Sequence, residues 1–351
     1  MERAIDMAAS FDFKERLGTG HFGEVWRVVD TGLNASRALK LIPPGKVWNP
    51  SNIFHEAQIL KQAEHPNVVK VEETGTMSDG KIYVAMEYLP KGSLEDEAKG
   101  AYVPLTRAQR IMIDALRGLQ HAHEKGIIHR DIKPANILVG SNKEGKLSDF
   151  GLAVPKSVNL KALGAKDYAY ILHLAPEIHS GGKYTILSDI YAAGVTLYRL
   201  INGDMFLPSV APDEVRQACL EGKFPDRANY REFVPRPMRM LVNRAIDVNR
   251  SRRFASAEEM RHTLEQLVIQ MNWNEQALAN GTRWASGWNS RCYEVVRIHE
   301  PNGKWSVETR KGGSRHSLRR VGSLCGKDLS KGKAVQLTKR VLQDHVLGRL
   351  R

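Results

Sequence analysis

Two short motifs constrain this chain more than any other feature: HRDIKPAN at residues 129–136 and DFG at 149–151. The first places a carboxylate (Asp131), an ammonium (Lys133) and an amide (Asn136) on one loop, and the second adds Asp149 shortly afterwards. Together these residues can orient an attacking hydroxyl, neutralise developing negative charge and bind magnesium through oxygen atoms. The two motifs therefore predict chemistry on a phosphate group.

A glycine-rich segment, GTGHFGEV at residues 18–25, is the second signal. Glycines at this spacing let the backbone approach a phosphate closely, because no Cβ intervenes and amide groups can point at the anion. A dinucleotide-binding turn has similar glycines, but it follows a buried strand and opens a helix. Here residues 11–17 alternate like a half-exposed strand and residues 24–29 continue as another strand. We therefore expect a strand–turn–strand hairpin that covers phosphates.

Lys40 lies in an apolar segment, RALKLI at residues 37–42, which we expect to be a third strand. A lysine in such surroundings is costly unless it is paired. The expected partner is Glu56, within a segment (51–62) that has an apolar face at helical spacing. The alternative is that the two charges are unrelated.

With these motifs in order, the chain resembles a eukaryotic-type (Hanks-type) Ser/Thr protein kinase over about residues 11–271. The resemblance implies an α+β, two-lobed fold and the use of ATP and Mg²⁺. Asp131 would orient the substrate hydroxyl and accept its proton, and Lys133 would neutralise the γ-phosphate. Lys40 would hold the α- and β-phosphates and pair with Glu56. Asn136 and Asp149 would bind the metal.

The resemblance also implies an adenine site at MEYLP, residues 86–90. Met86 would be the gatekeeper, and backbone groups of Glu87 and Leu89 would reach the base. The positions that would contact ATP otherwise are, for the phosphates, Gly18, Gly20 and Gly23, and, on either side of the base, Leu17, Val25, Ala38 and Leu138.

Matches continue further along the chain. LAPE at residues 174–177 corresponds to the end of the activation segment, and Asp189 would cap the backbone of the catalytic loop. Arg252 would pair with Glu177. Lys133, two residues after Asp131, is typical of the Ser/Thr kinases, because tyrosine kinases have an alanine–arginine pattern there. The resemblance thus favours a protein substrate with a Ser or Thr hydroxyl.

The activation segment departs from the family's pattern. Between Asp149 and Glu177 there is no threonine, and Ser157 is the only serine. Arg130 would read a phosphate on this segment, with Ser157, Tyr168 or Tyr170 as its candidate sources. We expect activation to be independent of segment phosphorylation or to depend on Ser157.

Composition and charge divide the chain. Our expected divisions are an extension (1–10), a kinase domain (11–271, with an N-lobe at 11–86, a hinge at 87–90 and a C-lobe at 91–271), a linker (272–281) and a small domain (282–351). Three widely spaced cysteines predict reduced thiols and a cytoplasmic location. We expect no membrane anchor, because no stretch approaches the roughly twenty apolar residues that a span needs. We expect no secretory signal, because the start, MERAIDMAASFDF, has no continuous apolar segment.

The last 80 residues contain 16 Lys or Arg against six Asp or Glu, a net +10 of the chain's +13. Four of the six tryptophans also lie there, which argues against disorder. Strands near 292–299, 304–310 and 315–321 and a helix over 333–347 predict a β-meander with a terminal helix. The basic charge fits a solvated face of a docking or regulatory module, or a surface that binds nucleic acid or another polyanion, and no motif favours the second.

Two further hypotheses come from the sequence. RRVGS at residues 319–323 resembles a basophilic phosphorylation site, so Ser323 could be an autophosphorylation or pseudosubstrate site. The second hypothesis is a pseudokinase scaffold that presents the basic domain. The presence of Lys40, Asp131 and Asp149 favours an active enzyme. The protein substrate, the upstream signal and the oligomeric state are not encoded in any motif.

Overall fold

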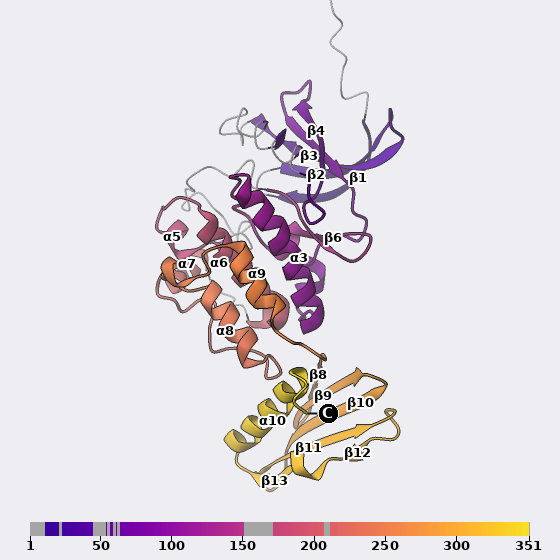
Figure 1. Ribbon diagram of the computed structural model, residues 1–351, viewed down its shortest axis with the longest axis vertical. Helices are drawn as coiled ribbons and strands as arrows, with labels where there is room; N and C mark the ends of the chain where they lie inside the picture. The colour runs from indigo at the N-terminus through magenta and orange to yellow at the C-terminus, as the bar shows by residue number, and fades with distance from the viewer. Residues whose placement is uncertain are drawn as a thin grey trace, which may run out of the picture.

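The computed structural model describes residues 11–20, 23–44, 54, 57–58, 61, 64–150, 171–206 and 211–350. Three parts follow one another along its long axis: a β-rich N-lobe, a helical C-lobe and a second sheet that carries one long helix (Figure 1). The first two form the two-lobed protein-kinase fold that the motifs predicted.

The N-lobe is a five-stranded antiparallel sheet in the order β1-β2-β3-β5-β4. Its strands are β1 (Phe11–Gly20), β2 (Gly23–Asp30), β3 (Ala35–Ile42), β4 (Val71–Thr76) and β5 (Ile82–Glu87). The predicted hairpin is confirmed, because β1 pairs with β2 and Gly20 lies opposite Gly23. A Cβ on Gly23 would lie 2.0 Å from the Leu41 carbonyl oxygen, so β2 can approach β3 there only with glycine.

The C-lobe is built around α6 (Ile186–Asn202), which is buried along nearly its whole length. A Cβ on Gly194 would come within 2.7 Å of the Ala245 side chain, so this glycine lets α6 and α8 pack closely. The other elements of the lobe are α2 (Glu95–Ala98), α3 (Leu105–Glu124), β6 (Ile137–Val139), β7 (Gly145–Leu147), α5 (Pro176–His179), α7 (Pro212–Leu220), α8 (Arg236–Ala245) and α9 (Ala257–Glu265). The long α3 buries residues at helical spacing, Ile111, Ala115 and Leu119 among them, against this core.

The C-terminal part, here called the basic module (residues 274–350), is a meander with a terminal helix, as predicted. Its strands are β8 (Asn274–Leu278), β9 (Gly281–Trp288), β10 (Arg291–His299), β11 (Trp305–Gly312), β12 (Arg319–Arg320) and β13 (Gly326–Leu329), and its helix is α10 (Lys331–Val346). The strand order is β12-β11-β10-β9-β8, with β13 also paired to β11. α10 covers one face of this sheet, where Val341 and Leu342 are fully buried (Figure 1).

The predicted linker at 272–281 needs correction, because residues 274–278 form the first strand of the module. Their polar pattern, NEQAL, does not alternate like a half-buried strand. The strand forms because β9 supplies a hydrogen-bonding partner along its whole length, from Asn274 opposite Ala285 to Leu278 opposite Gly281.

The module and the C-lobe share one continuous hydrophobic core, which includes Phe233 from the lobe and Trp273 and Trp284 from the module side. Tyr102 connects them directly: its hydroxyl donates to the Trp273 carbonyl and accepts from the Glu275 amide, both at 2.8 Å. The carboxylate of Glu232 on the C-lobe accepts from Arg297 of β10 at 2.7 Å, and the Glu232 carbonyl accepts from Gln343 of α10 at 2.9 Å. The module is therefore held against the C-lobe by packing and by hydrogen bonds.

Candidate active site

The loop that carries Asp131 is fixed by a buried carboxylate from the centre of the C-lobe. Asp189, in the first turn of α6, accepts hydrogen bonds from the backbone amides of His129 at 2.8 Å and Arg130 at 2.9 Å. His123, at the end of α3, donates from Nε2 to the same carboxylate at 2.9 Å. The predicted cap is confirmed. It holds Arg130 in a left-handed conformation (φ +70°), which turns the chain into the site.

Asp131, Lys133 and Asn136 meet at that loop. The Oδ2 atom of Asp131 accepts from Lys133 Nζ at 2.8 Å and from Asn136 Nδ2 at 2.9 Å. Asn136 also donates to the Asp131 carbonyl at 2.7 Å, so its side chain closes the loop on itself. The other carboxylate oxygen, Oδ1, is buried and accepts no hydrogen bond within the residues that the structure describes. Oδ2 of Asp131 is thus held in place, while Oδ1 can still accept a hydrogen bond.

Asp149 lies opposite this loop and pairs with Lys40 of β3. The Lys40 ammonium is 2.8 Å from Asp149 Oδ1. Burial by itself would raise the pKa of the Asp149 carboxyl, but Lys40, and after it Lys133, lowers this pKa below its ordinary value. The group is therefore a carboxylate at neutral pH. Asp149 adopts a left-handed backbone (φ +52°), and the next residue, Phe150, packs its ring on His129 at 4.5 Å.

The contact between Lys40 and Asp149 was not among the sequence predictions, which gave Lys40 the partner Glu56. Glu56 lies outside the described residues. No spacing rule could have found the observed pair, because its two members are 109 residues apart and belong to different lobes. The only sequence signal that Lys40 and Asp149 have in common is a charged residue within an apolar segment.

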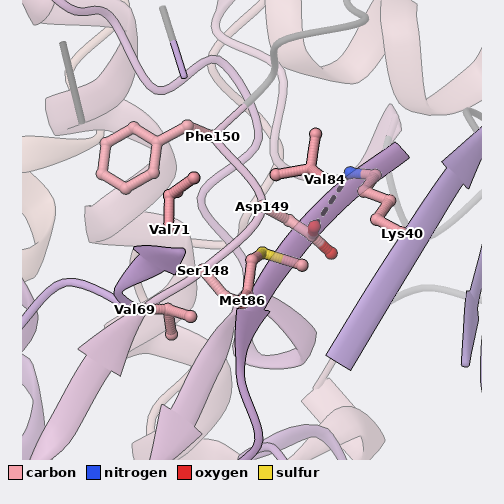
Figure 2. A pocket seen from close by; sticks show the side chains of 8 residues that line it. All are labelled: Lys40, Val69, Val71, Val84, Met86, Ser148, Asp149 and Phe150. Atoms are coloured by element: carbon pink, nitrogen blue, oxygen red, sulfur yellow. Dashed lines mark hydrogen bonds and ion pairs between the residues drawn. The ribbon is translucent and has the colours of Figure 1, made fainter. Parts of the chain in front are cut away.

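A small pocket contains this ion pair. Figure 2 shows its lining: Lys40, Val69, Val71, Val84, Met86, Ser148, Asp149 and Phe150. Met86 faces Ala38 across β5 and β3, so the predicted gatekeeper and one predicted adenine contact lie side by side. The pocket joins an apolar wall to the ion pair of Lys40 and Asp149.

The other predicted ATP contacts lie around the junction of the lobes. Val25 of β2 is opposite Gly18 of β1, and Leu17 beside them is 44% exposed, which leaves its side chain open for contact with a ligand. Leu138 of β6 forms a bridge with Ser93 just beyond the hinge. Gly20 ends β1 and Gly23 begins β2. The predicted contacts of the N-lobe thus lie on β1, β2, β3 and β5, and Leu89 of the hinge is partly buried against the core; their contact with ATP stays a prediction.

One residue near the hinge was missed by sequence reasoning. Lys146 of β7 donates to both carboxylate oxygens of Glu87, at 2.7 and 3.0 Å, and the Lys70 amide donates to Glu87 at 2.8 Å. These bonds tie the end of β5 to the C-lobe hairpin and to the segment before β4. The Glu87 amide also donates to the Lys70 carbonyl at 3.0 Å, so backbone and side chain of Glu87 together hold the start of the hinge.

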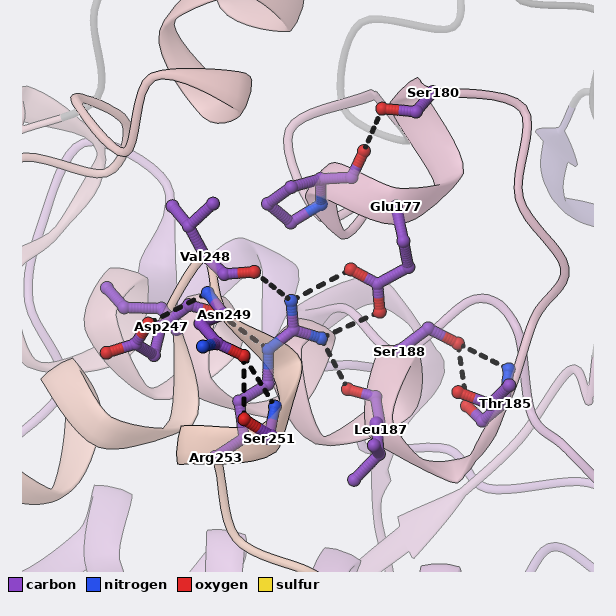
Figure 3. Close-up of polar contacts among 12 residues, drawn as sticks. Glu177, Ser180, Thr185, Leu187, Ser188, Asp247, Val248, Asn249, Ser251 and Arg253 are labelled. Carbon is purple, nitrogen blue, oxygen red and sulfur yellow. Dashed lines mark hydrogen bonds and ion pairs between the residues drawn. The ribbon is translucent and has the colours of Figure 1, made fainter.

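The predicted partner of Glu177 was wrong by one residue. Arg253, not Arg252, forms the buried ion pair: its two terminal nitrogens are each 2.8 Å from one Glu177 oxygen (Figure 3). Arg253 also donates to the backbone carbonyls of Asp247 and Leu187. The short 3-10 turn Arg250–Arg252 points the first arginines to solvent, and the extended residue after it points inward.

Several predicted residues are not part of this cluster. Ser157, Tyr168 and Tyr170 lie outside the described residues. Ser323 lies in the basic module, exposed, in the 3-10 turn Gly322–Leu324. Arg319 and Arg320 of the same motif are paired in a strand, so RRVGS is not the free extended segment that a pseudosubstrate requires. Within the part of the chain that is described, no three His, Cys, Asp or Glu side chains gather as a metal site, and no helix is long and apolar enough to cross a membrane.

The comparisons with known proteins agree with this geometry. The family model described as "Protein kinase domain" matches residues 11–264. The chain therefore belongs to the protein kinase family, and its catalytic domain is of the Hanks type found in Ser/Thr kinases. The matched region ends before β8, so the basic module is not covered by it.

Three relatives illustrate the similarity. The chain is 29% identical over 266 residues to serine/threonine-protein kinase PknJ of Mycobacterium tuberculosis, which covers 72% of this chain and 44% of the relative. It is 31% identical over 265 residues to PknB of the same species, with coverages of 72% and 42%. It is 30% identical over 281 residues to serine/threonine-protein kinase DCLK3 of Mus musculus, with coverages of 77% and 34%. The chain thus spans less than half the length of these relatives.

Proposed function

We propose that this chain is an ATP- and magnesium-dependent Ser/Thr protein kinase that phosphorylates protein hydroxyls. The observation that carries the proposal is the arrangement at Asp131, where Lys133 and Asn136 hold one carboxylate oxygen and leave the other as an acceptor. Membership of the kinase family and the Ser/Thr kinase names of the relatives support the same conclusion.

The residues present fit ATP and Mg²⁺ by their chemistry. Asp149 is a carboxylate at neutral pH, and Asn136 provides an amide oxygen within the same loop system, so the two offer the oxygen ligands that magnesium prefers. Lys40 is a cation that reaches Asp149 from the N-lobe, close to the hairpin of Gly18, Gly20 and Gly23. Bound there, ATP with its metal would supply the phosphoryl group and much of the charge neutralisation.

The chain's own residues would do the rest. Asp131 would accept the substrate hydroxyl through Oδ1, orient its oxygen and take its proton. Lys133, held at 2.8 Å by the other oxygen, would place a positive charge beside the reacting group. Asp189 would keep the loop from relaxing, because it satisfies two backbone amides at once. Catalysis by this site is therefore mostly positioning and electrostatics.

We also propose a cytoplasmic location, supported by cysteines that are all free thiols in this structure. Protein substrates are proposed, because the APE–arginine framework around Glu177 and Arg253 shapes the lobe that borders the substrate side in protein kinases. Ser157 and Ser323 remain proposed phosphorylation sites. For Ser323 we favour modification by a second molecule, since its motif is folded into the module.

The test is phosphate incorporation from labelled ATP with magnesium, into the chain itself and into a generic basic protein. We expect Asp131→Ala to abolish incorporation and Lys133→Met to lower the turnover number by about 10²- to 10³-fold. Lys143→Met is the matched control, because Lys143 is exposed at the turn between β6 and β7 and its variant should keep full activity. No incorporation by the wild type would instead favour the pseudokinase scaffold.

A further inference from the structure

Arg199, near the end of α6, pairs with two carboxylates at once. Only 3% of its side chain is exposed. Its Nη2 atom donates to Glu95 at 2.9 Å, and its Nε atom donates to Asp204 at 3.1 Å. Its Nη1 atom donates to Nε2 of the buried His173 at 3.4 Å, so this imidazole nitrogen carries no proton. We call these four residues the Arg199 cluster, in which one buried positive charge joins three segments of the C-lobe.

Two of these segments contact the catalytic loop directly. Thr196, which lies one turn before Arg199 on the same face of α6, donates to the Ile132 carbonyl beside the proposed base at 3.4 Å. Glu95 begins α2, and the amide of the residue before it donates to the Ile137 carbonyl, at the end of that loop, at 3.0 Å. The Arg199 cluster therefore lies beside the loop that would hold the substrate hydroxyl.

The two carboxylates of the cluster reach the surface. The side chains of Glu95 and Asp204 are 31% and 28% exposed, although the arginine between them is buried. An extended peptide advances about 3.3 Å per residue, so residues three or four positions from the phosphorylated hydroxyl lie roughly 10–13 Å from the catalytic loop. Arg199 lies only one helical turn, about 5 Å, beyond the residue that touches this loop. Peptide residues at those positions thus come within reach of the two carboxylates.

We propose that Arg199 sets the charge preference of the peptide-binding site. Because it pairs with both Glu95 and Asp204, it largely neutralises the attraction of these carboxylates for a basic residue of the substrate. The substrate class is then Ser- or Thr-containing segments that need no Arg or Lys near the phosphorylated residue. Removing the arginine would release two partly exposed carboxylates, which form strong charge-assisted hydrogen bonds with Arg. This inference rests on the proposed kinase function.

The test measures binding of fluorescent peptides to the full-length chain, with alanine in place of the phosphorylated serine, so that no turnover is needed. The first probe, LRRVGAL, comes from residues 318–324 of this chain, and LAAVGAL lacks its two arginines. A third probe, LAGVRRL, has the arginines on the other side of the alanine. The measured quantity is the charge ratio, which is the affinity for an arginine probe divided by the affinity for LAAVGAL. Partial unfolding lowers both affinities alike, so the charge ratio is independent of stability.

Four variants are compared with the wild type. Arg199→Leu removes the proposed determinant, and a triple variant adds Glu95→Gln and Asp204→Asn to it. The single variant Glu95→Gln keeps the buried arginine paired with Asp204, so it should fold even if Arg199→Leu does not. Arg117→Leu is the matched control, because Arg117 also joins two carboxylates, one of α3 at 3.2 Å and one of α9 at 2.9 Å.

We expect the wild type to have a charge ratio below about 3, because carboxylates that are already paired add little affinity. Arg199→Leu should raise the charge ratio of at least one arginine probe by about 10-fold, because each released carboxylate contributes up to about 5-fold. The triple variant should return to the wild-type ratio, and Arg117→Leu should not differ from it. Glu95→Gln should lower the ratio by about 3-fold, since Arg199 then balances the one remaining carboxylate.

The assignment is wrong if neither Arg199→Leu nor Glu95→Gln changes the charge ratio, if Arg117→Leu raises it as much as Arg199→Leu does, or if the rise persists in the triple variant. Phosphate incorporation into the serine form of LAAVGAL is measured separately in the wild type. Its absence together with a shifted charge ratio would reject the kinase reaction and retain the role of Arg199. Turnover with an unshifted ratio would reject the role of Arg199 alone, so the two proposals can fail independently.

Discussion

Glu275, on the first strand of the basic module, joins the module to the C-lobe through Arg231. One carboxylate oxygen of Glu275 accepts from Arg231 Nη1 at 2.7 Å, and the other accepts from the indole of Trp284 at 2.9 Å. The Arg231 side chain is only 6% exposed and lies over the ring of Tyr102. A buried cation of the kinase lobe thus takes its counter-charge from a residue outside the region that the kinase family model matches.

We predict that Glu275→Ala lowers the free energy of unfolding by about 3 kcal/mol, because it removes the carboxylate that accepts from the buried Arg231 guanidinium. Glu308→Ala is the matched control: its partner Arg310 is exposed, so its loss should cost about 1 kcal/mol or less. Urea unfolding of both variants checks this. Equal, small changes in the two variants would show that the interface contributes little.

Removing the module should destabilise the kinase domain. A chain that ends at Met271 loses the partners of Tyr102, Arg231 and Glu232 and exposes part of a shared core. We expect the full-length chain to unfold in one cooperative transition and the shortened chain to unfold roughly 10 °C lower. Differential scanning calorimetry distinguishes this from two independent transitions, the outcome expected of a loosely tethered domain.

The ion pair of Glu177 allows a comparison between neighbouring arginines. Arg253→Ala should lower the free energy of unfolding by about 3–5 kcal/mol, because its side chain is fully buried and its loss leaves Glu177 unpaired. Arg252→Ala, one residue earlier and exposed, should change stability by less than about 0.5 kcal/mol. Thermal or urea unfolding checks the pair. The reverse order of effects would mean that the 3-10 turn is misplaced by one residue.

A buried histidine should make stability depend on pH. Burial, and then repulsion from Arg216, lowers the pKa of His179 to about 4 in the folded chain. A folded pKa below that of the unfolded chain, about 6.5, favours folding above pH 6.5, and this contribution is lost as the pH falls toward 4.

We therefore expect the wild type to lose about 2 kcal/mol more than His179→Leu when the pH falls from 7 to 5. The measured quantity is the difference in stability loss between the wild type and the variant. His129 and His345 also have lowered pKa values, and they add a loss of stability of the same sign to both proteins. Urea unfolding at several pH values provides the measurement. Parallel pH profiles of the two proteins would contradict the assignment to His179.

The sequence by itself determined the grouping of the proposed catalytic residues. Asp131, Lys133 and Asn136 lie within six residues. Because the loop is so short, their side chains must lie close together. The hairpin of Gly18 to Val25 and the strand of Lys40 could also be predicted, because alternation and glycine spacing are local signals. The meander and the helix of the module followed from the same kind of signal.

Tertiary structure alone decided the long-range pairs. Lys40 meets Asp149 across the two lobes, Glu87 meets Lys146, and Arg253 replaces Arg252 because one turn of 3-10 helix shifts the inward position by a residue. The strand at 274–278 forms because β9 pairs with it, and the buried Arg231 has its carboxylate partner, Glu275, on that strand. Local patterns specify which conformation a segment adopts, whereas the partner of a buried charge depends on how distant segments pack, which no single stretch of sequence contains.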